Sequence, residues 1–77
     1  MSARNQIDQA AADNGWLARG ARLTIDYRRG DKAVTVEYSR PGGILWCARG
    51  NERYSLADTG KCDIVLGWLR ASDEETT

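Results

Sequence analysis

The sequence predicts an α+β domain, a three-stranded antiparallel β-meander covered on one face by an N-terminal and a C-terminal helix (α-β-β-β-α). Two observations predict this fold. Apolar and polar residues alternate over 21–29 and 32–39, which is typical of half-buried strands. Apolar residues near both ends of the chain recur at helical spacing. Because a sheet with one apolar face needs a cover, we expect the two helices to pack on that face.

Length and composition limit what this chain can be. It has 77 residues, with 11 basic and 11 acidic side chains, no His and two Cys. Histidine is the commonest general base and metal ligand, and two Cys cannot complete a four-ligand zinc site. No apolar run approaches the roughly 20 residues of a membrane span, and no signal peptide is visible. We therefore expect one cytoplasmic domain over 1–72 without metal, cofactor or membrane contact, and a disordered acidic tail over 73–77.

The first helix is predicted over residues 3–14. Ser2 can cap its start, and Asn14-Gly15 is a typical stop. Its apolar stripe is mostly alanine, so we expect Trp16 and Leu17 to supply the missing bulk.

The last helix is predicted from Thr59 or Gly60 to Arg70, with Asp58 or Thr59 as its cap. Before it, residues 53–56 are expected to form either a short strand or an extended link. One face of the helix is apolar and should pack on the sheet. That face contains Cys62, Ile64, Val65, Leu66, Trp68 and Leu69.

A hairpin is predicted between the segments 21–29 and 32–39. Glycine at the first position of a two-residue turn suits a hairpin, so the turn should be Gly30-Asp31. The same turn accounts for the match of Arg29-Gly30-Asp31 to the integrin-binding tripeptide. The resulting register puts every apolar side chain on one face. It pairs Leu23 with Tyr38, Ile25 with Val36 and Tyr27 with Val34.

A third strand is predicted over 44–49, after a turn at residues 40–43, and two registers are open for it. A three-residue loop would point Ile44, Trp46 and Ala48 into the core. A two-residue turn would place Cys47 opposite Val36, so that Trp46 faces outward.

We favour the inward register, because large aromatic side chains are usually buried. In the outward register Trp46 would lie near Glu37 and Thr24 on an arginine-bearing surface. It would then be a strong candidate for a binding anchor.

The residues that could carry chemistry have structural explanations. Cys47 and Cys62 are expected to be free thiols, although Cys62, in a first helical turn, could have a lowered pKa. Without histidine it lacks the usual catalytic partner. The sequence contains no phosphate loop, nucleotide fingerprint or metal-ligand spacing. We therefore expect that the chain is not an enzyme.

Two carboxylates, those of Asp26 and Glu37, fall on the polar face of the predicted hairpin. The register places them diagonally, and Arg22 and Arg28 stand beside them on the same strand. We expect an exposed lattice of salt bridges here rather than a pair of catalytic carboxylates.

Seven residues form the candidate binding surface, on the predicted strands and in their turns. They are Arg22, Thr24, Arg28, Arg29, Glu37, Arg40 and Trp46. Arginines beside an exposed aromatic ring can hold a nucleic-acid backbone or base. However, acidic residues interrupt this surface. Three of the 11 acidic residues are in the tail, which leaves 11 basic against 8 acidic side chains over 1–72, far from the strongly basic surface of a dedicated nucleic-acid binder.

By elimination, the sequence predicts a small non-catalytic module that binds a protein. A free edge of the first or third predicted strand could also add to another sheet, as a homodimer or a strand-addition complex. The alternative is a nucleic-acid-binding module that uses the arginine-bearing outer face of the sheet, with binding that weakens steeply as salt rises.

Most of the chain resembles small accessory proteins of unknown function from actinobacteria and their phages. The similar stretches are Ala10-Ala11-Ala12-Asp13-Asn14-Gly15-Trp16, Tyr27-Arg28-Arg29-Gly30-Asp31 with Val34-Thr35-Val36, and Gly60-Lys61-Cys62-Asp63-Ile64-Val65-Leu66-Gly67-Trp68-Leu69. The resemblance implies a phage or prophage origin. The protein partner would then be a host factor or a defence component in the host cytoplasm.

The predicted order of elements also resembles two nucleic-acid-binding folds. Double-stranded RNA-binding domains share the helix–three strands–helix order, but a lysine cluster opens their last helix. Here the stretch 58–63 has one Lys and two Asp. Three strands and a helix ending in Gly67-Trp68-Leu69-Arg70 resemble the arm-binding domains of phage integrases.

Overall fold

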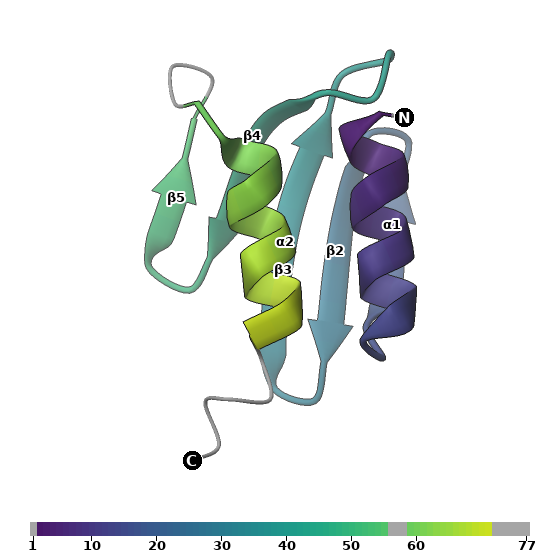
Figure 1. The fold of residues 1–77 in the computed structure, drawn as a ribbon, viewed down its shortest axis with the longest axis vertical. Helices are drawn as coiled ribbons and strands as arrows, with labels where there is room; N and C mark the ends of the chain where they lie inside the picture. The colour runs from purple at the N-terminus through teal and green to yellow at the C-terminus, as the bar shows by residue number, and fades with distance from the viewer. Residues whose placement is uncertain (1, 56–58, 72–77) are drawn as a thin grey trace.

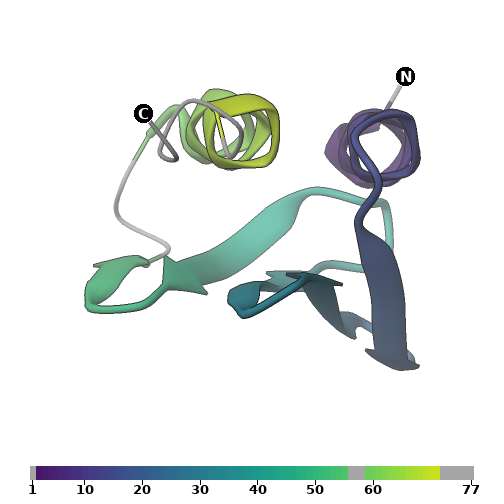
Figure 2. The same ribbon diagram turned by 90° about the horizontal axis from the view of Figure 1, so that it is seen from below.

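The computed structural model describes residues 2–55 and 59–71, which form an α+β fold with a five-stranded antiparallel sheet. Both helices lie on one face of the sheet (Figures 1 and 2). In chain order the elements are α1 (Ala3–Asp13), β1 (Leu17–Ala21), β2 (Thr24–Arg29), β3 (Lys32–Tyr38), β4 (Ile44–Arg49), β5 (Glu52–Tyr54) and α2 (Lys61–Ala71).

The α+β class and the two covering helices are confirmed, but the prediction of three strands is wrong. The sheet has the order β1-β2-β3-β4-β5, so it gains one strand at each edge. The order of elements therefore also departs from that of double-stranded RNA-binding domains. Asp58, Leu56 and the acidic tail over 73–77, on which further expectations rest, lie outside the described residues.

The additional strand β1 results from a turn that the sequence pattern did not predict. The predicted strand over 21–29 is divided at Arg22-Leu23, and Ala21 pairs with Thr24 across this turn. Arg22 has a φ of 58°, which is uncommon for any residue with a side chain. Leu17, at the start of β1, is 71% exposed, so the expectation that it adds bulk to the core is wrong.

The β2–β3 hairpin agrees with the prediction. Arg29 pairs with Lys32, which leaves Gly30 and Asp31 as the two turn residues. Ile25 lies opposite Val36 and Tyr27 opposite Val34. The Tyr38 N–H donates to the Leu23 carbonyl at 2.8 Å, which extends the predicted register to its last pair.

The register of β4 combines features of the two predicted registers. Cys47 lies opposite Val36 and is buried, whereas Trp46 lies opposite Glu37 on the outer face. The inward prediction is therefore wrong for Trp46, and also for Ala48, which does not belong to the core. The register then shifts between Glu37 and Tyr38, so that Ile44 lies opposite Tyr38 and packs against the core. A bulge at this point changes the face on which the following residue lies.

The edges of the sheet are not the expected ones. We expected the segments 21–29 and 44–49 to carry free edges, but β1 and β5 cover most of them. Of the two alternatives for residues 53–56, a short strand is the one observed, since β5 includes residues 53 and 54 and Arg53 lies opposite Ala48 in an antiparallel pair. The edge strands of the described sheet are thus β1 and β5.

Local hydrogen bonds fix where the helices begin and end. The Ser2 side chain accepts a hydrogen bond from the Asn5 N–H at 3.2 Å, as predicted, and α1 is followed by Asn14 as its cap. In α2 the Ile64 N–H donates to the Gly60 carbonyl at 3.1 Å, so Gly60 takes the capping position rather than Thr59.

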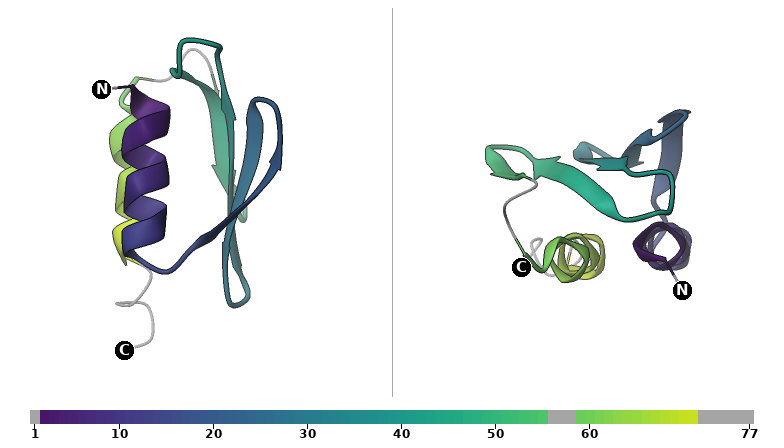
Figure 3. Two further views of the ribbon diagram at one scale, coloured as in Figure 1. Left: turned by 90° about the vertical axis from the view of Figure 1, so that its right-hand side faces the viewer. Right: turned by 90° about the horizontal axis from the view of Figure 1, so that it is seen from above.

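The core lies between the helices and the inner face of the sheet (Figure 3). Trp16 is 5% exposed and its indole Nε1 donates to the Leu69 carbonyl at 3.1 Å, which ties the end of α1 to α2. Both helices and strands β2 to β4 contribute buried apolar side chains. These are Ile7, Ala10, Ala11, Trp16, Ile25, Tyr27, Val34, Val36, Tyr38, Cys47, Val65, Leu66, Trp68 and Leu69.

Candidate functional site

The candidate site is the outer face of the sheet, which neither helix covers (Figure 2). Alternation along the strands divides the side chains between the two faces, since neighbours in a strand point to opposite sides. The register aligns the outward residues of successive strands. They are Leu17, Arg19 and Ala21 of β1, Thr24, Asp26 and Arg28 of β2, Ala33, Thr35 and Glu37 of β3, Trp46 and Ala48 of β4, and Arg53 of β5.

Trp46 lies at the centre of a small cluster on this face. Its indole Nε1 donates a hydrogen bond to a Glu37 carboxylate oxygen on the neighbouring strand. The Arg53 guanidinium from β5 lies 4.6 Å from the centroid of the indole ring. The sequence predicted that an outward Trp46 would lie near Glu37, but it did not include Arg53. These two contacts hold the indole in a defined position on a surface that would otherwise leave it free to move.

An open groove continues from this cluster to one end of the face. Its volume is about 690 Å³, and it is formed by the β1–β2 turn, the ends of β2 and β3, and the segment that follows β3. Arg22 and Arg40 line it from two different turns, together with Thr24 and Glu37. The groove therefore combines two guanidinium groups with one carboxylate, and that carboxylate is already bonded to Trp46.

The two carboxylates of the face have neutral hydrogen-bond donors. Asp26 accepts a hydrogen bond from the Thr35 hydroxyl at 2.7 Å, and Glu37 accepts from Trp46. They lie diagonally, as predicted, because Thr24 is opposite Glu37 and Asp26 is opposite Thr35. The predicted lattice of salt bridges from these carboxylates to Arg22 and Arg28 is therefore wrong, because the donors are Thr35 and Trp46. Arg22 and Arg28 are both exposed to solvent.

Six of the seven predicted surface residues come together on this side of the sheet, and Arg29 does not. Arg29 is the last residue of β2 and points to the face opposite to that of Arg28. Its Nε lies on the helix side, 3.8 Å from the position that a Cβ on Gly15 would occupy. The seven predicted residues do not include Arg19 and Arg53, which the face gains from β1 and β5. Arg19 could be assigned to this surface only by recognising β1 as a strand.

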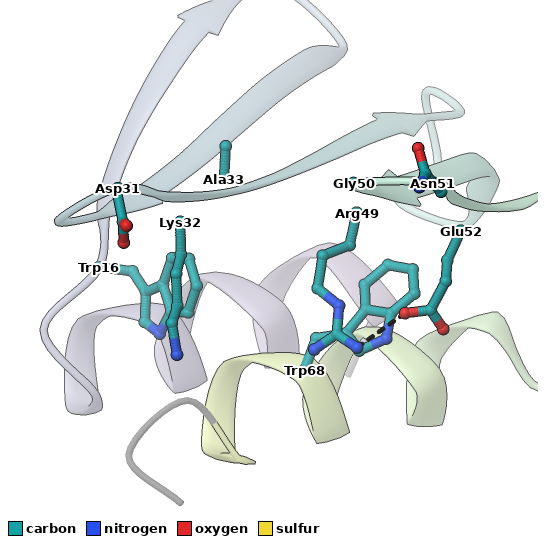
Figure 4. A pocket seen from close by; sticks show the side chains of 9 residues that line it. All are labelled: Trp16, Asp31, Lys32, Ala33, Arg49, Gly50, Asn51, Glu52 and Trp68. Carbon is teal, nitrogen blue, oxygen red and sulfur yellow. Dashed lines mark hydrogen bonds and ion pairs between the residues drawn. The ribbon is translucent and has the colours of Figure 1, made fainter. Parts of the chain in front are cut away.

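A second pocket opens on the helix side, at the end of the molecule where α2 ends (Figure 4). Its volume is about 490 Å³, and Trp16 and Trp68 contribute to its wall. The Arg49 guanidinium lies 5.1 Å from the Trp68 ring centroid and 2.7 Å from a Glu52 carboxylate oxygen. The guanidinium of Arg49 in this pocket is therefore already bound by Trp68 and Glu52 of the same chain.

The titratable groups with shifted pKa values lie away from the outer face. Burial raises the pKa of Tyr27 and of Tyr38 well above the usual tyrosine value. Burial, and then the charge of Asp63, raises the pKa of the Cys62 thiol. The suggestion of a lowered pKa for Cys62 is therefore wrong. Cys47 and Cys62 are both free thiols, as predicted.

Within 2–55 and 59–71, no group of three or more His, Cys, Asp or Glu side chains is placed to hold a metal ion. No helix in this part of the chain is long and apolar enough to cross a membrane. Comparisons with protein families, with characterised proteins and with solved structures give no match.

Proposed function

We propose that this chain is a small non-catalytic module that binds a partner protein through the outer face of the sheet. The observation that carries this proposal is the cluster of Trp46, Glu37 and Arg53, which holds an aromatic ring and a guanidinium together on a face without helices. Tryptophan and arginine are the side chains that most often dominate binding energy in protein interfaces. The two tyrosines with raised pKa values are fully buried and cannot meet a substrate, which supports a non-catalytic role.

Charge supports an acidic contact surface on the partner. Five arginines lie on the outer face or line its groove, against two carboxylates of the face that already accept hydrogen bonds within the chain. The arginines are Arg19, Arg22, Arg28, Arg40 and Arg53. Such a charge excess guides association and excludes basic partners more than it adds affinity. The resemblance to phage accessory proteins would make the partner a host protein.

Nucleic acid is the second candidate, and the outward position of Trp46 favours it, because bases stack on exposed aromatic rings. Two observations weigh against it. Arg53 already covers one side of the indole. The excess of 11 basic over 8 acidic side chains across 1–72 is also small for a dedicated nucleic-acid binder. We therefore prefer a protein partner.

Photo-crosslinking from two positions tests the proposal. A benzoylphenylalanine residue would replace Ala48, on the outer face, and in a matched control Asp63, on the exposed side of α2. Each variant would be irradiated in an extract of a candidate host, and the adducts treated separately with protease and with nuclease. We expect a protein adduct from position 48 alone, and at least a tenfold loss of that adduct when Trp46→Ala is added.

The opposite results are equally clear. The same adducts from both positions, or none from position 48 in any host tried, would contradict binding through the outer face. An adduct that nuclease removes would favour the nucleic-acid alternative. That alternative also predicts that log Kd for a single-stranded oligonucleotide rises with log salt, with a slope of about 0.7 for each phosphate contact.

A further inference from the structure

We infer that the partner protein contributes an extended segment that adds to the free edge of β1 as a further antiparallel strand. The segment would carry alternating acidic and small apolar side chains. This inference rests on the proposed protein-binding function and names the way in which the partner is recognised. Figure 2 shows β1 at the edge of the sheet, below α1.

The backbone of β1 presents hydrogen-bonding groups to an incoming strand. Hydrogen-bonded and non-hydrogen-bonded pairs alternate along antiparallel strands, and a two-residue turn is closed by a hydrogen-bonded pair. Ala21 and Thr24 close the β1–β2 turn, so the backbone groups of Ala21, Arg19 and Leu17 point toward β2. Those of Ala18 and Gly20 consequently point away from the sheet, and in the described part of the chain no strand lies beside them.

This edge lacks most of the features that usually protect an edge strand, and the exception is the charge of Arg19. All five residues of β1 are exposed, and the strand contains no Pro, no Lys and no inward-pointing charge. The edge at β5 is only three residues long, and the Arg49–Glu52 ion pair lies at its start. A strand partner therefore finds a longer and less guarded edge at β1.

On the helix side, β1 borders a groove that suits small apolar side chains. The groove lies between α1 and β1 and has a volume of about 250 Å³. Ala11 and Ala12 line it from the helix, and Ala18 and Gly20 line it from the strand. Arg4 and Asp8, which form an ion pair with each other, line the rest of the helix side. Alternate side chains of an added strand would point to this side. In strand addition the main chain provides affinity and such pockets select the side chains.

On the outer side, the charges around β1 favour acidic side chains. Arg19 is the outward residue between Ala18 and Gly20, so the partner residue beside it would share its face. Arg28 lies opposite Leu17 on the neighbouring strand and adds a second positive charge. Cross-strand pairs of opposite charge are favourable, whereas like charges placed directly opposite each other are not.

The same rule argues against a second copy of this chain as the occupant. Two β1 strands related by a two-fold axis that pairs Ala18 with Gly20 of the other copy would place the two Arg19 side chains opposite each other. A segment with Glu at that position replaces this repulsion with attraction.

The experiment uses two blocked peptides and two variants of the full chain. The peptides are four repeats of Glu-Val and four repeats of Lys-Val, each labelled for fluorescence anisotropy. Ala18→Pro removes the outward N–H of Ala18 and leaves that of Gly20, and proline is tolerated at such a position of a sheet edge. Ala18→Ser is the matched control, because it keeps the N–H and adds one atom.

We expect saturable binding of the Glu-Val peptide at least tenfold tighter than that of the Lys-Val peptide. Ala18→Pro should weaken it at least tenfold and Ala18→Ser less than threefold, with circular dichroism of both variants unchanged. Equal binding by the two variants, or no saturable binding to the wild-type chain, would overturn the inference. A wild-type dimer in sedimentation that Ala18→Pro dissociates would also overturn it, in favour of a second copy.

Failure of this inference can be told apart from failure of the proposed function. Trp46 and Arg53 lie on β4 and β5, toward the edge of the sheet opposite to β1. A partner adduct that is lost with Trp46→Ala but unchanged with Ala18→Pro would leave the outer face as the binding site and remove only strand addition.

Discussion

Two tyrosine hydroxyl groups meet in the core between α1 and the sheet. The Tyr27 hydroxyl donates to an Asp8 carboxylate oxygen at 2.6 Å, and a second hydrogen bond of 2.6 Å joins Tyr27 to Tyr38. Because the Tyr27 proton points to Asp8, Tyr38 must be the donor in the second bond. Both tyrosines are 0% exposed, so their two hydroxyl groups have to find their partners within the protein. Asp8, at the end of this chain of bonds, is exposed.

Alkaline unfolding tests the tyrosine pair. Burial raises the folded-state pKa of both tyrosines above the unfolded value of about 10. Their stabilising contribution is therefore complete below pH 10 and declines as the pH rises above it. Each tyrosine should lower the free energy of unfolding by about 1.4 kcal/mol per pH unit in that range. Urea titrations between pH 8 and 11 would measure this slope.

The matched variants are Tyr27→Phe and Tyr54→Phe. Tyr27→Phe removes one titrating group and should make the slope shallower, while costing about 1–3 kcal/mol at pH 7, since the buried Tyr38 hydroxyl loses its acceptor. Tyr54 lies outside this network, and its variant should keep the wild-type slope. Identical slopes in all three proteins would show that the buried pair does not control alkaline stability.

At the scale of elements, agreement between independent signals decided which parts of the fold were predictable. The β2–β3 hairpin was predicted because the Gly30-Asp31 turn and the apolar alternation require the same register. The turn at Arg22-Leu23 has neither glycine nor asparagine, and β1 consists mainly of small residues with low strand propensity. Nothing in the sequence therefore separated β1 from β2.

The register of β4 was not predictable for a different reason. Burial of aromatic rings is a preference, and Trp46 finds compensating contacts on the outer face with Glu37 and Arg53. The shift between Glu37 and Tyr38 lets Ile44 reach the core while Trp46 remains outside. Amino-acid composition does not reveal a bulge of this kind. Each of the two predicted registers assumed regular pairing along the whole strand, so each is wrong at one end of β4.

Glycine substitution tests the β1–β2 hairpin. Gly20 has a φ of +147°, and an added Cβ would lie 2.2 Å from the Thr24 carbonyl oxygen. Gly20→Ala should therefore cost about 3 kcal/mol, because backbone atoms must move. Gly30 has a φ of +61° but nothing within 4 Å of the added Cβ, so Gly30→Ala should cost about 1 kcal/mol. Urea unfolding of both variants would check this order, and equal losses would contradict the twisted geometry of this hairpin.

A pair of tryptophan variants tests whether Trp46 lies on the outer face of the sheet rather than in the core. Trp68 is 7% exposed and packs in the core, so Trp68→Ala should cost about 3–5 kcal/mol. Trp46 has one hydrogen bond and one cation–π contact on the outer face, and Trp46→Ala should cost about 1 kcal/mol. Chemical denaturation would give both values. A loss at Trp46 as large as that at Trp68 would place Trp46 in the core, as the inward register required.

At the scale of the whole molecule, the two faces of the sheet differ in what they carry and in whether helices cover them. The inner face and the helices bury the apolar side chains, which leaves the outer face to carry arginine, threonine and tryptophan without a cover. Much of the candidate surface was predictable, because alternation alone assigns Thr24, Arg28 and Glu37 to the same side. The contribution of β1 and β5 was not, since it depends on edge strands that contain few apolar residues.

The two thiols test whether the helix layer and the sheet open as one unit. Cys47 is 0% exposed beneath the helices, whereas Cys62 in α2 is partly exposed and its pKa is raised by burial. In the Cys47→Ala variant, Cys62 should react with an aromatic disulfide reagent at pH 8 more slowly than free cysteine. Its rate should also continue to rise at pH values where free cysteine has reached its plateau.

In the Cys62→Ala variant, Cys47 should react at least about 10³-fold more slowly than Cys62 does, because it requires unfolding of the domain. Its rate should then rise with urea in proportion to the unfolded population. A Cys47 rate that is independent of low urea concentrations would instead mean that α2 lifts from the sheet in a local opening. The helix layer would then be a separable cover, and the outer face would not be the only surface of the sheet that a partner can reach.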